Sequence, residues 1–433
     1  MVRLAWPIVL AELGWQTMGF VDTIVVGRLP DSAASIAAVS LGTIIFYTVG
    51  IFGSGLLLGL DTVVSQAHGA QDRADGHRSI VNALYLTAPL SVVLMAILWA
   101  CRPLLDRIGE RPEVMRLMIP YLTTLTWSII PLLLYFALRR YLQATNMVHS
   151  VMFALISANI VNLVGNIALV YGKWGAPALG VPGSAWATLI SRIYMAAVLT
   201  AVLITSERPG RDWPWKPDFA RMLRLLRLGL PAGSQILLET GVFAVAAALI
   251  GTIDSASLAA HQIALNAASF TFMVTLGIGS AAAVRVGQAL GRQDVRAAAT
   301  SGWMALLLGV GFMSCSAVVF WSFPGYMARL YTPDPQVIRI AVSLLFIAGI
   351  FQVFDGTQIV LAGALRGAGD THTPMYCSLF GYWFVGLPLG AYLCFHKKWG
   401  AVGIWTGLCV ALIVIGSILL AVWWARVKRW QLS

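Results

Sequence analysis

The sequence predicts an all-α integral membrane protein with twelve transmembrane helices in two six-helix lobes, related by a pseudo-two-fold axis along the membrane normal. Three observations lead to this: the composition, the recurrence of long apolar windows, and an internal repeat. The 433 residues are 59% hydrophobic and only 11% charged, and their mean hydropathy is +0.80. Soluble chains carry about 25% charged residues, so this composition is that of a polytopic membrane protein.

The apolar windows set the number of spans. A helix needs about 20 apolar residues to cross a hydrocarbon core of about 30 Å, and windows of that length recur along almost the whole chain. A membrane β-barrel would instead show apolar and polar residues alternating in segments of about ten. We therefore expect twelve helices, with cores near 5–27, 41–66, 79–101, 117–138, 149–171, 183–205, 229–251, 259–287, 297–321, 336–362, 375–395 and 401–425.

The basic residues predict the orientation. With both termini in the cytoplasm, eighteen Lys and Arg residues fall on the cytoplasmic side and ten on the opposite side, while Arg192 falls inside a span. This bias follows the positive-inside rule for an even number of spans. The net charge of +11 then reflects topology and attraction to anionic lipid headgroups, and it does not indicate nucleic-acid binding. The first apolar segment has no A-x-A-like cleavage site, so we expect it to be a span.

An internal repeat predicts the two lobes. The string "SIAAVS" at Ser35 reappears as "SLAAHQ" at Ser257, and "SQAHGAQD" at Ser65 reappears as "GQALGRQD" at Gly287, both 222 residues later. Two halves of six spans in the same direction form a parallel repeat, with a cavity expected between the lobes. We expect lobes at 1–205 and 229–433, joined by a basic cytoplasmic linker at 206–228. This organisation is typical of transporters.

Ionisable residues inside the spans are the first candidates for function. An Asp at the centre of a membrane helix costs about 2.5–3.5 kcal/mol on insertion scales. The candidates are Glu12, Asp22, Asp61, Arg192, Glu239 and Asp355. Each also has a structural interpretation, either a span end that reaches interfacial water or a buried group bonded to polar neighbours. For Asp61 and Arg192 that interpretation is at least as good as a functional one.

Glu239 and Asp355 lie deep in two spans of the second lobe. Two carboxylates that share one region of low dielectric repel each other, so one of them must hold a proton or both must share a cation. They could therefore bind H⁺ or Na⁺, and Na⁺ is the one metal ion that the sequence suggests. The five cysteines and six histidines show neither CxxC nor HExxH spacing, and we read the cysteines as packing residues.

In the first lobe Asp22 is accompanied by two amides. Asn162 and Asn166 are four residues apart, so they share one helical face. They could present amide groups to the cavity, or they could bond neighbouring helices together, as polar residues do in membrane bundles. The sequence leaves these two interpretations equally open.

Eight strings in order resemble one transporter family. That family is the multidrug and toxic compound extrusion (MATE) transporters, and the resemblance is closer to their bacterial NorM-like branch. It covers essentially the whole chain. The strings are "GFVDTIVVGRL", "LDTVVSQAHGAQD", N-x-x-x-N with "ALVYG", "GSAWATLISR", "LLETGVFAVAAALIG", "LAAHQIALNAASFTFMVTLGIGSAAAVRVGQALG", "FDGTQIVLAGALRGAGDTHTP" and "YWFVGLPLGAYL".

The resemblance implies an antiporter, not an enzyme, that exports amphipathic and often cationic organic compounds in exchange for Na⁺ or H⁺ by alternating access. It implies a multi-pass protein of the bacterial inner membrane. We expect it to act as a monomer among membrane lipids, without a cofactor beyond the coupling ion. The matching residues are Glu239 and Asp355 for cation coupling, Asp22, Asn162, Asn166 and Thr188 for a first-lobe polar cluster, and Gln262, Asn266 and Phe351 as cavity lining.

Two residues depart from the family pattern. Four residues before Asp355, Na⁺-coupled members often have Tyr, whereas this chain has Phe351; the missing hydroxyl removes a cation contact and weakens the Na⁺ assignment. Glu12 is an additional acid in the first span. We expect it either to favour cationic substrates or to reach the cytoplasmic headgroups.

Two other function classes are less compatible with the sequence. A lipid-linked oligosaccharide flippase of the same broader superfamily would line its cavity with several Arg or Lys residues for pyrophosphate, and here Arg192 is the one basic residue assigned deep in a span. A membrane-embedded enzyme would need a compact catalytic set, and the histidines provide none.

Overall fold

The computed structural model describes residues 1–105, 112–208 and 213–432, and within them the chain is helical, with no strand. Eleven helices are long and apolar enough to cross a membrane, or up to twelve if one bent pair counts as a single span. The bent pair covers the expected window at 117–138 and stands in the place of the fourth span. The predicted fold class is confirmed, and the number of spans depends on that one break.

The first half of the chain contains nine α-helices and one 3₁₀ turn in the described residues. These are α1 (Val2–Val26), α2 (Ser32–Leu56), α3 (Gly59–Gly69), α4 (Arg73–Ala100), α5 (Arg102–Leu105), α6 (Pro112–Trp127), α7 (Ile129–Ala144), α8 (Val148–Tyr171), η1 (Lys173–Gly175) and α9 (Val181–Glu207). Helices α8 and α9 pack against each other, and α9 also packs against α6 and α7.

The second half follows after the linker region. Its elements are α10 (Phe219–Gly251), α11 (Ser255–Gly291), α12 (Val295–Ser322), α13 (Pro324–Arg329), α14 (Pro335–Gly367), α15 (His372–Ser378), η2 (Leu379–Gly386), α16 (Leu387–Ala391), η3 (Tyr392–His396) and α17 (Ala401–Leu432). Helix α14 packs against α11, α12 and α17. The segments η2 and η3 are π-helical, and together with α15 and α16 they form one candidate span.

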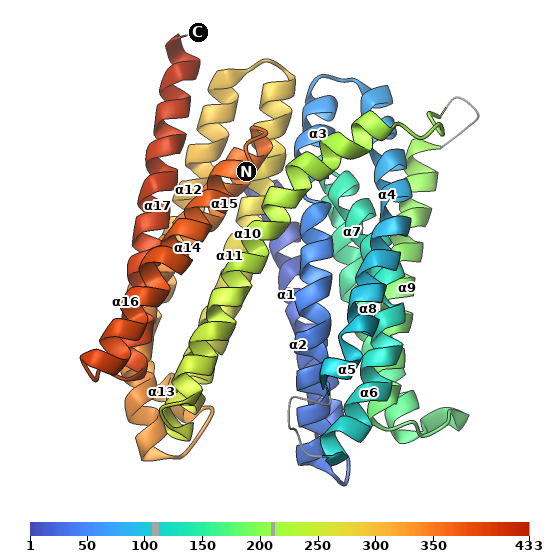
Figure 1. The fold of residues 1–433 in the computed structure, drawn as a ribbon. Coiled ribbons are helices and arrows are strands. Elements are labelled where there is room, and N and C mark those ends of the chain that lie inside the picture. The colour runs from blue at the N-terminus through green and yellow to red at the C-terminus, as the bar shows by residue number, and fades with distance from the viewer. Residues whose placement is uncertain (106–111, 209–212, 433) are drawn as a thin grey trace. The chain divides into compact units, whose positions relative to one another are not determined.

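The chain divides into two compact units, each built of long helices that run side by side (Figure 1). The N-terminal unit comprises Leu10–His68 and Asp72–Gly233, and the C-terminal unit comprises Met1–Val9, Gly69–Gln71 and Ser234–Ser433. Helices α1 and α10 therefore each contribute residues to both units. The lobe and linker boundaries expected from the repeat remain a prediction.

The expected linker is partly helical, because α10 begins at Phe219. Residues 209–212 of that linker lie outside the described residues. Two of the basic residues assigned to the non-cytoplasmic side, Arg107 and Arg111, also lie outside them.

The break in the fourth span has a local cause. Helices α6 and α7 are bent by 44° at Ser128, and Pro131 lies in the first turn of α7. Proline has no N–H for the helical hydrogen bond, and its ring clashes with the carbonyl four residues earlier, which here belongs to Trp127. At the break the Ser128 hydroxyl and the Ser128 backbone N–H both donate to the Leu125 carbonyl, at 2.5 and 3.0 Å.

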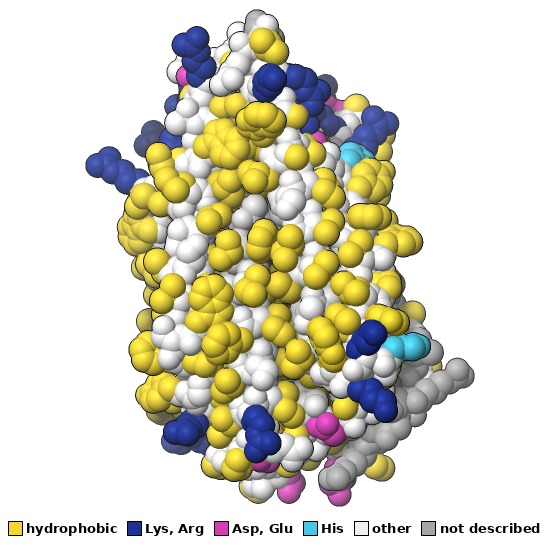
Figure 2. Space-filling model, turned by 90° about the vertical axis from the view of Figure 1, so that its left-hand side faces the viewer, with side chains coloured by type: hydrophobic (Ala, Val, Ile, Leu, Met, Phe, Trp, Pro, Cys, Tyr) yellow, Lys and Arg dark blue, Asp and Glu magenta, His cyan; other side chains and the backbone are white. Residues whose placement is uncertain are grey.

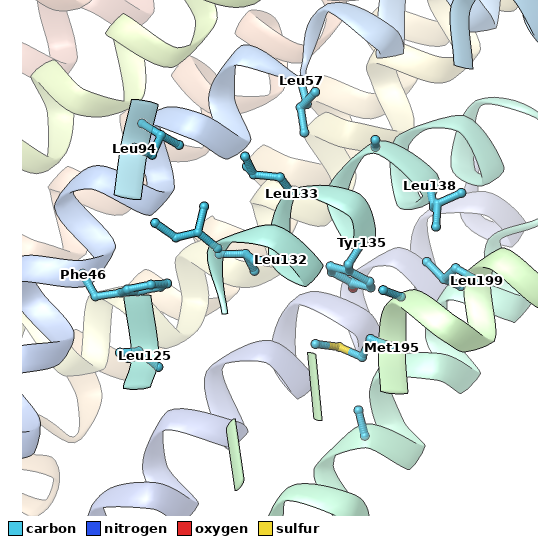
Figure 3. Close-up of a cluster of buried hydrophobic side chains, with 14 of the residues drawn as sticks. Phe46, Leu57, Leu94, Leu125, Leu132, Leu133, Tyr135, Leu138, Met195 and Leu199 are labelled. Carbon is cyan, nitrogen blue, oxygen red and sulfur yellow. The ribbon is translucent and has the colours of Figure 1, made fainter. Parts of the chain in front are cut away.

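The core of the N-terminal unit is continuous and apolar. Figure 3 shows part of it, where side chains from α2, α4, α6, α7 and α9 meet. Phe46 and Leu133 are fully buried there, and Met195 reaches the same cluster from α9. This packing holds the broken span in place against its neighbours.

The outer surface matches a membrane environment. On the face shown in Figure 2, hydrophobic side chains cover the middle, and Lys and Arg side chains gather toward the two ends. Many large apolar residues are exposed, among them Phe384, Val318 and Leu307. Such a surface would be unfavourable in water and is expected where lipid tails surround a protein.

Candidate functional site

Helix α14 carries the centre of the C-terminal candidate site. Asp334 caps its first turn by accepting a hydrogen bond from the Gln336 backbone N–H at 2.8 Å. Within the helix Phe351, Asp355 and Gln358 are four and three residues apart, so they lie on one face. Asp355 is 5% exposed, and it is thus a carboxylate enclosed by protein.

Glu239 joins this site from α10. It is partly buried, and its Oε2 accepts a hydrogen bond of 3.4 Å from Gln358 Nε2. The Tyr382 hydroxyl, on the π-helical η2, donates to Gln358 Oε1 at 3.1 Å. Glu239 and Asp355 interact electrostatically with each other. The site therefore joins α10, α14 and η2 within the C-terminal unit.

Among the described residues, no ion pair compensates the charge of this site. In the described part of the chain, neither Glu239 nor Asp355 takes part in an ion pair. Glu239 is bonded to the neutral amide of Gln358, which is in turn bonded to the phenol of Tyr382. No group of three or more His, Cys, Asp or Glu side chains gathers among the residues described. Repulsion between two carboxylates is relieved by a proton or by a cation that both bind, and a hard cation would take its remaining ligands from neutral oxygens.

The N-terminal unit holds a second polar cluster around Asp22 of α1. Asn166 Nδ2 donates to Asp22 Oδ1 at 2.7 Å, and Thr188 Oγ1 donates to Asp22 Oδ2 at 2.9 Å. Asn162 lies beside the same carboxylate, and neither atom of its amide has a hydrogen-bond partner among the described residues. All four side chains are at least 94% buried. Helices α1, α8 and α9 thus enclose one acid in hydrogen-bond donors.

Arg192 completes the surroundings of this cluster. It is buried on α9, donates to the Ser128 hydroxyl at the break of the fourth span, and lies 4.6 Å from the centre of the Phe46 ring. It also interacts electrostatically with Asp22. The bent span and the acid are therefore linked through one guanidinium group.

The other acids of this unit are paired with arginines. Arg139 donates to Glu12 Oε1, and both side chains are buried. Arg140 Nη1 lies 3.5 Å from Asp61 Oδ2. Glu12 thus has a partner that neither sequence interpretation of it named. Asp61 follows the structural interpretation, because it is buried and its charge is paired.

Sequence comparison places the chain in a family. The MatE family profile matches residues 7–168 and again 231–392, which together are more than half of the chain, and the two matches follow the internal repeat. The chain belongs to the MatE family. It is 37% identical over 437 residues to the "Probable multidrug resistance protein NorM" of Mesorhizobium japonicum, an alignment that covers 98% of this chain and 93% of that protein.

Further MatE relatives and solved structures agree. The "Multidrug resistance protein PmpM" of Pseudomonas aeruginosa is 36% identical, with 99% of this chain and 91% of the relative covered. The structure titled "Crystal structure of MATE in the bent conformation" has a TM-score of 0.90 at 20% identity and covers 99% of this chain and 95% of its own. The structure of "eukaryotic MATE transporter AtDTX14" has a TM-score of 0.84 at 20% identity, with 99% and 96% covered. At these identities the structures support the MATE fold alone.

The structure brings together most of the expected MATE site residues. Asp22 is bonded to Asn166 and Thr188, and Glu239 interacts electrostatically with Asp355. Gln262 and Asn266 are both exposed and lie on one face of α11. Their role as cavity lining stays a prediction.

Phe351 is buried among aromatic rings. Its ring centre lies 5.7 Å from that of Trp405 and 6.1 Å from that of Phe243. It therefore forms part of an aromatic wall beside Asp355, and it offers no oxygen to a cation.

Sequence reasoning missed two neutral members of the C-terminal site. Gln358 could have been found, because a polar residue three positions after Asp355 shares its helical face. Tyr382 gave no such signal, since its place opposite Gln358 depends on how η2 packs. Arg139 was assigned to the cytoplasmic side without a partner, and the structure shows that its side chain is buried and paired with Glu12.

Proposed function

We propose that this MatE protein is a cation-coupled antiporter that exports amphipathic, often cationic organic compounds, with Glu239 and Asp355 as the residues that bind the coupling ion. One observation supports the assignment most directly: two interacting carboxylates lie together in one unit without an arginine or lysine partner among the described residues. The relatives named for multidrug resistance support the class of substrate.

The exchange follows from electrostatics. With both carboxylates ionised, the site repels anions and attracts a cationic substrate. When H⁺ or Na⁺ binds, the negative charge falls and the attraction for that substrate weakens, so the substrate is released. Coupling between two ligands is reciprocal, and hence the ion and the substrate must each weaken the binding of the other. Alternating access then converts the ion gradient into export.

We propose that the Asp22 cluster is a second binding site, which lies in the N-terminal unit. Its carboxylate is held by Asn166 and Thr188, and the unsatisfied amide of Asn162 is a polar group available to a substrate or to water. Gln262 and Asn266 are proposed to contribute polar groups to the substrate path. The protein is proposed to work as a monomer in the bacterial inner membrane, with both termini in the cytoplasm.

A lipid-linked oligosaccharide flippase remains the alternative. Such a protein would bind a pyrophosphate group with unneutralised basic side chains. The buried arginines here are directed at other partners: Arg139 at Glu12, Arg140 at Asp61, and Arg192 at Ser128 with Asp22 nearby. These contacts favour the drug antiporter.

The test is dye transport in proteoliposomes. Vesicles containing the wild type are loaded with an ethidium-like dye, and either a Na⁺ gradient or a proton gradient is imposed. We expect one of the two gradients to drive dye movement, and we expect Glu239→Gln and Asp355→Asn to reduce that response by at least about fivefold. Glu113→Gln serves as a matched control, because Glu113 is an exposed acid at the start of α6.

Two results would overturn the proposal. One is transport at the wild-type rate by both site variants under the effective gradient. The other is movement of a lipid-linked sugar with no movement of dye, which would favour the flippase.

A further inference from the structure

A fully buried histidine outside the acid site is held by a single hydrogen bond. His261 lies on α11 and is 0% exposed. Its Nδ1 is 3.0 Å from Nε1 of Trp405 on α17. An indole N–H can only donate, so Nδ1 must be the unprotonated acceptor, and the proton of the neutral ring is on Nε2. Among the described residues, Nε2 has no hydrogen-bond partner.

This arrangement is incompatible with a protonated ring. An imidazolium has N–H groups at both nitrogens and no acceptor, so protonation of His261 must break the bond to Trp405. It would also leave two donors and a charge buried, which is costly without acceptors. Protonation therefore requires α11 and α17 to separate at this level, or Trp405 to rotate away.

The bond is connected to the acid site by an aromatic wall. The Trp405 ring packs on Phe351 at 5.7 Å between centres, Phe351 packs on Phe243 at 6.1 Å, and Phe243 packs on Tyr382 at 6.3 Å. Tyr382 in turn bonds Gln358, the partner of Glu239. A shift of Trp405 thus changes the shape of a wall that ends at the carboxylate pair.

A second connection runs through the helix backbone. Gly407, two residues after Trp405, packs directly against the backbones of Gly386 and Gly390, where any Cβ would collide. This close approach fixes the start of α17 to η2 and α16, and Tyr382 lies on η2. Trp405 and Tyr382 are therefore carried by one tightly packed pair of helices.

We propose that His261 is a positioning residue whose hydrogen bond to Trp405 fixes the aromatic wall of the drug site, and that protonation of His261 releases that wall. Protonation of His261 would make substrate binding depend on pH, and this effect would be separate from ion coupling by Glu239 and Asp355. The transport measurement described below rests on the proposed export function, whereas the spectroscopic measurement does not.

Other titratable groups near His261 do not account for such an effect. The helices packed against α11 contribute Asp355 on α14, Cys315 on α12 and Cys409 on α17. Among the described residues, none of these forms a hydrogen bond or an ion pair with His261, whose one hydrogen bond is that from Trp405. A response of Trp405 to pH would therefore report on His261 itself.

The first test is spectroscopic and needs no transport. Tryptophan emission of the purified full-length protein is recorded from about pH 8 down to about pH 3. The range extends below the pH 8 to pH 5 in which an ordinary histidine changes charge, because a buried ring without an acceptor is harder to protonate. Three proteins are compared: wild type, Trp405→Phe and His261→Gln. The glutamine can still accept from the indole but does not titrate. We expect the emission component that is absent in Trp405→Phe to change with pH in the wild type and to stay constant in His261→Gln.

The second test is the apparent KM for dye export over the same pH range. In the wild type we expect KM to rise about fivefold at the acidic end, the factor that one hydrogen bond contributes, while His261→Gln stays nearly constant. Any pH dependence that both proteins share belongs to the carboxylates. If His261→Gln does not fold, Trp405→Phe must show a raised KM that no longer responds to this titration.

The proposal is wrong if the Trp405 emission is the same at both ends of the range, or if it titrates equally in His261→Gln. Those results leave the carboxylate proposal intact. Conversely, transport at the wild-type rate in Glu239→Gln, together with a normal Trp405 titration, would contradict the carboxylate proposal and leave the His261 proposal intact.

Discussion

The buried acids of the two units differ in the partners of their carboxylates. In the N-terminal unit Glu12 and Asp61 are each paired with an arginine, and Asp22 has Arg192 nearby. In the C-terminal unit Glu239 and Asp355 interact with each other, and Glu239 accepts a hydrogen bond from the neutral amide of Gln358. A buried carboxylate that is already neutralised is a structural element, whereas one without a cation can bind one from outside. Whether a charge is functional therefore depends on its partner more than on its depth.

The largest expected effect concerns the Glu12–Arg139 pair. Removing one partner of a buried ion pair leaves an uncompensated charge, so Glu12→Gln should lower the free energy of unfolding by about 3–5 kcal/mol. Transport per folded molecule should be retained, because Glu12 is not part of either proposed site. Unfolding in a denaturant series, followed in detergent, measures the change.

A double variant sharpens this test. Replacing both partners, as in Glu12→Leu with Arg139→Leu, removes both charges and should be neutral or stabilising by about 1–4 kcal/mol. If Glu12→Gln is as stable as the wild type, the pair is not structural, and the contrast between the units fails at this point.

Much of the fold could be predicted from sequence, because the bilayer restricts the possible structures so strongly. Composition and window length gave the helices, and the repeat indicated two halves. The break at Ser128 was missed even though Pro131 is a visible signal. The π-helical turn at Leu379–Gly386 had none, since its hydrogen-bond register depends on close packing against α17.

The candidate sites, too, could be predicted only in part from the sequence. Acids within apolar segments are conspicuous because their cost is local and can be read from the sequence. Their partners are not: Arg139 is 127 residues from Glu12, and Gln358 is 119 residues from Glu239. Only the folded arrangement distinguishes a neutralised acid from one without a cation.

The next effect concerns the donors around Asp22. Thr188→Val keeps the shape of the side chain but removes a hydrogen bond to a carboxylate, so stability should fall by about 1.5–3 kcal/mol. Thr200→Val on the same helix is the matched control, because its hydroxyl donates to a backbone carbonyl of its own helix, that of Ala196. Thermal unfolding of both variants measures their losses of stability. Equal losses would mean that Thr188 does not hold Asp22.

The C-terminal acids should show the opposite pattern, with function lost and stability kept. Asp355→Asn removes a buried charge that has no partner, so the unfolding temperature should stay the same or rise. Gradient-driven dye export should fall by about 5–150-fold, the usual range of a coupling free energy. Parallel unfolding and transport assays give both values. A variant that is strongly destabilised yet still coupled would place Asp355 with the structural acids.

The smallest effect would show whether the C-terminal site can be adapted to Na⁺. Phe351 lies on the same face of α14 as Asp355, and it has no oxygen to offer a cation. Phe351→Tyr adds one, and a single added contact should raise the Na⁺ stimulation of dye export about two- to tenfold. Phe243→Tyr adds the same hydroxyl to the neighbouring ring and serves as the control, with export compared in Na⁺ and in choline. If both variants respond alike, or neither responds, a hydroxyl at Phe351 does not reach the ion. Coupling would then have to be explained by the two carboxylates and a proton.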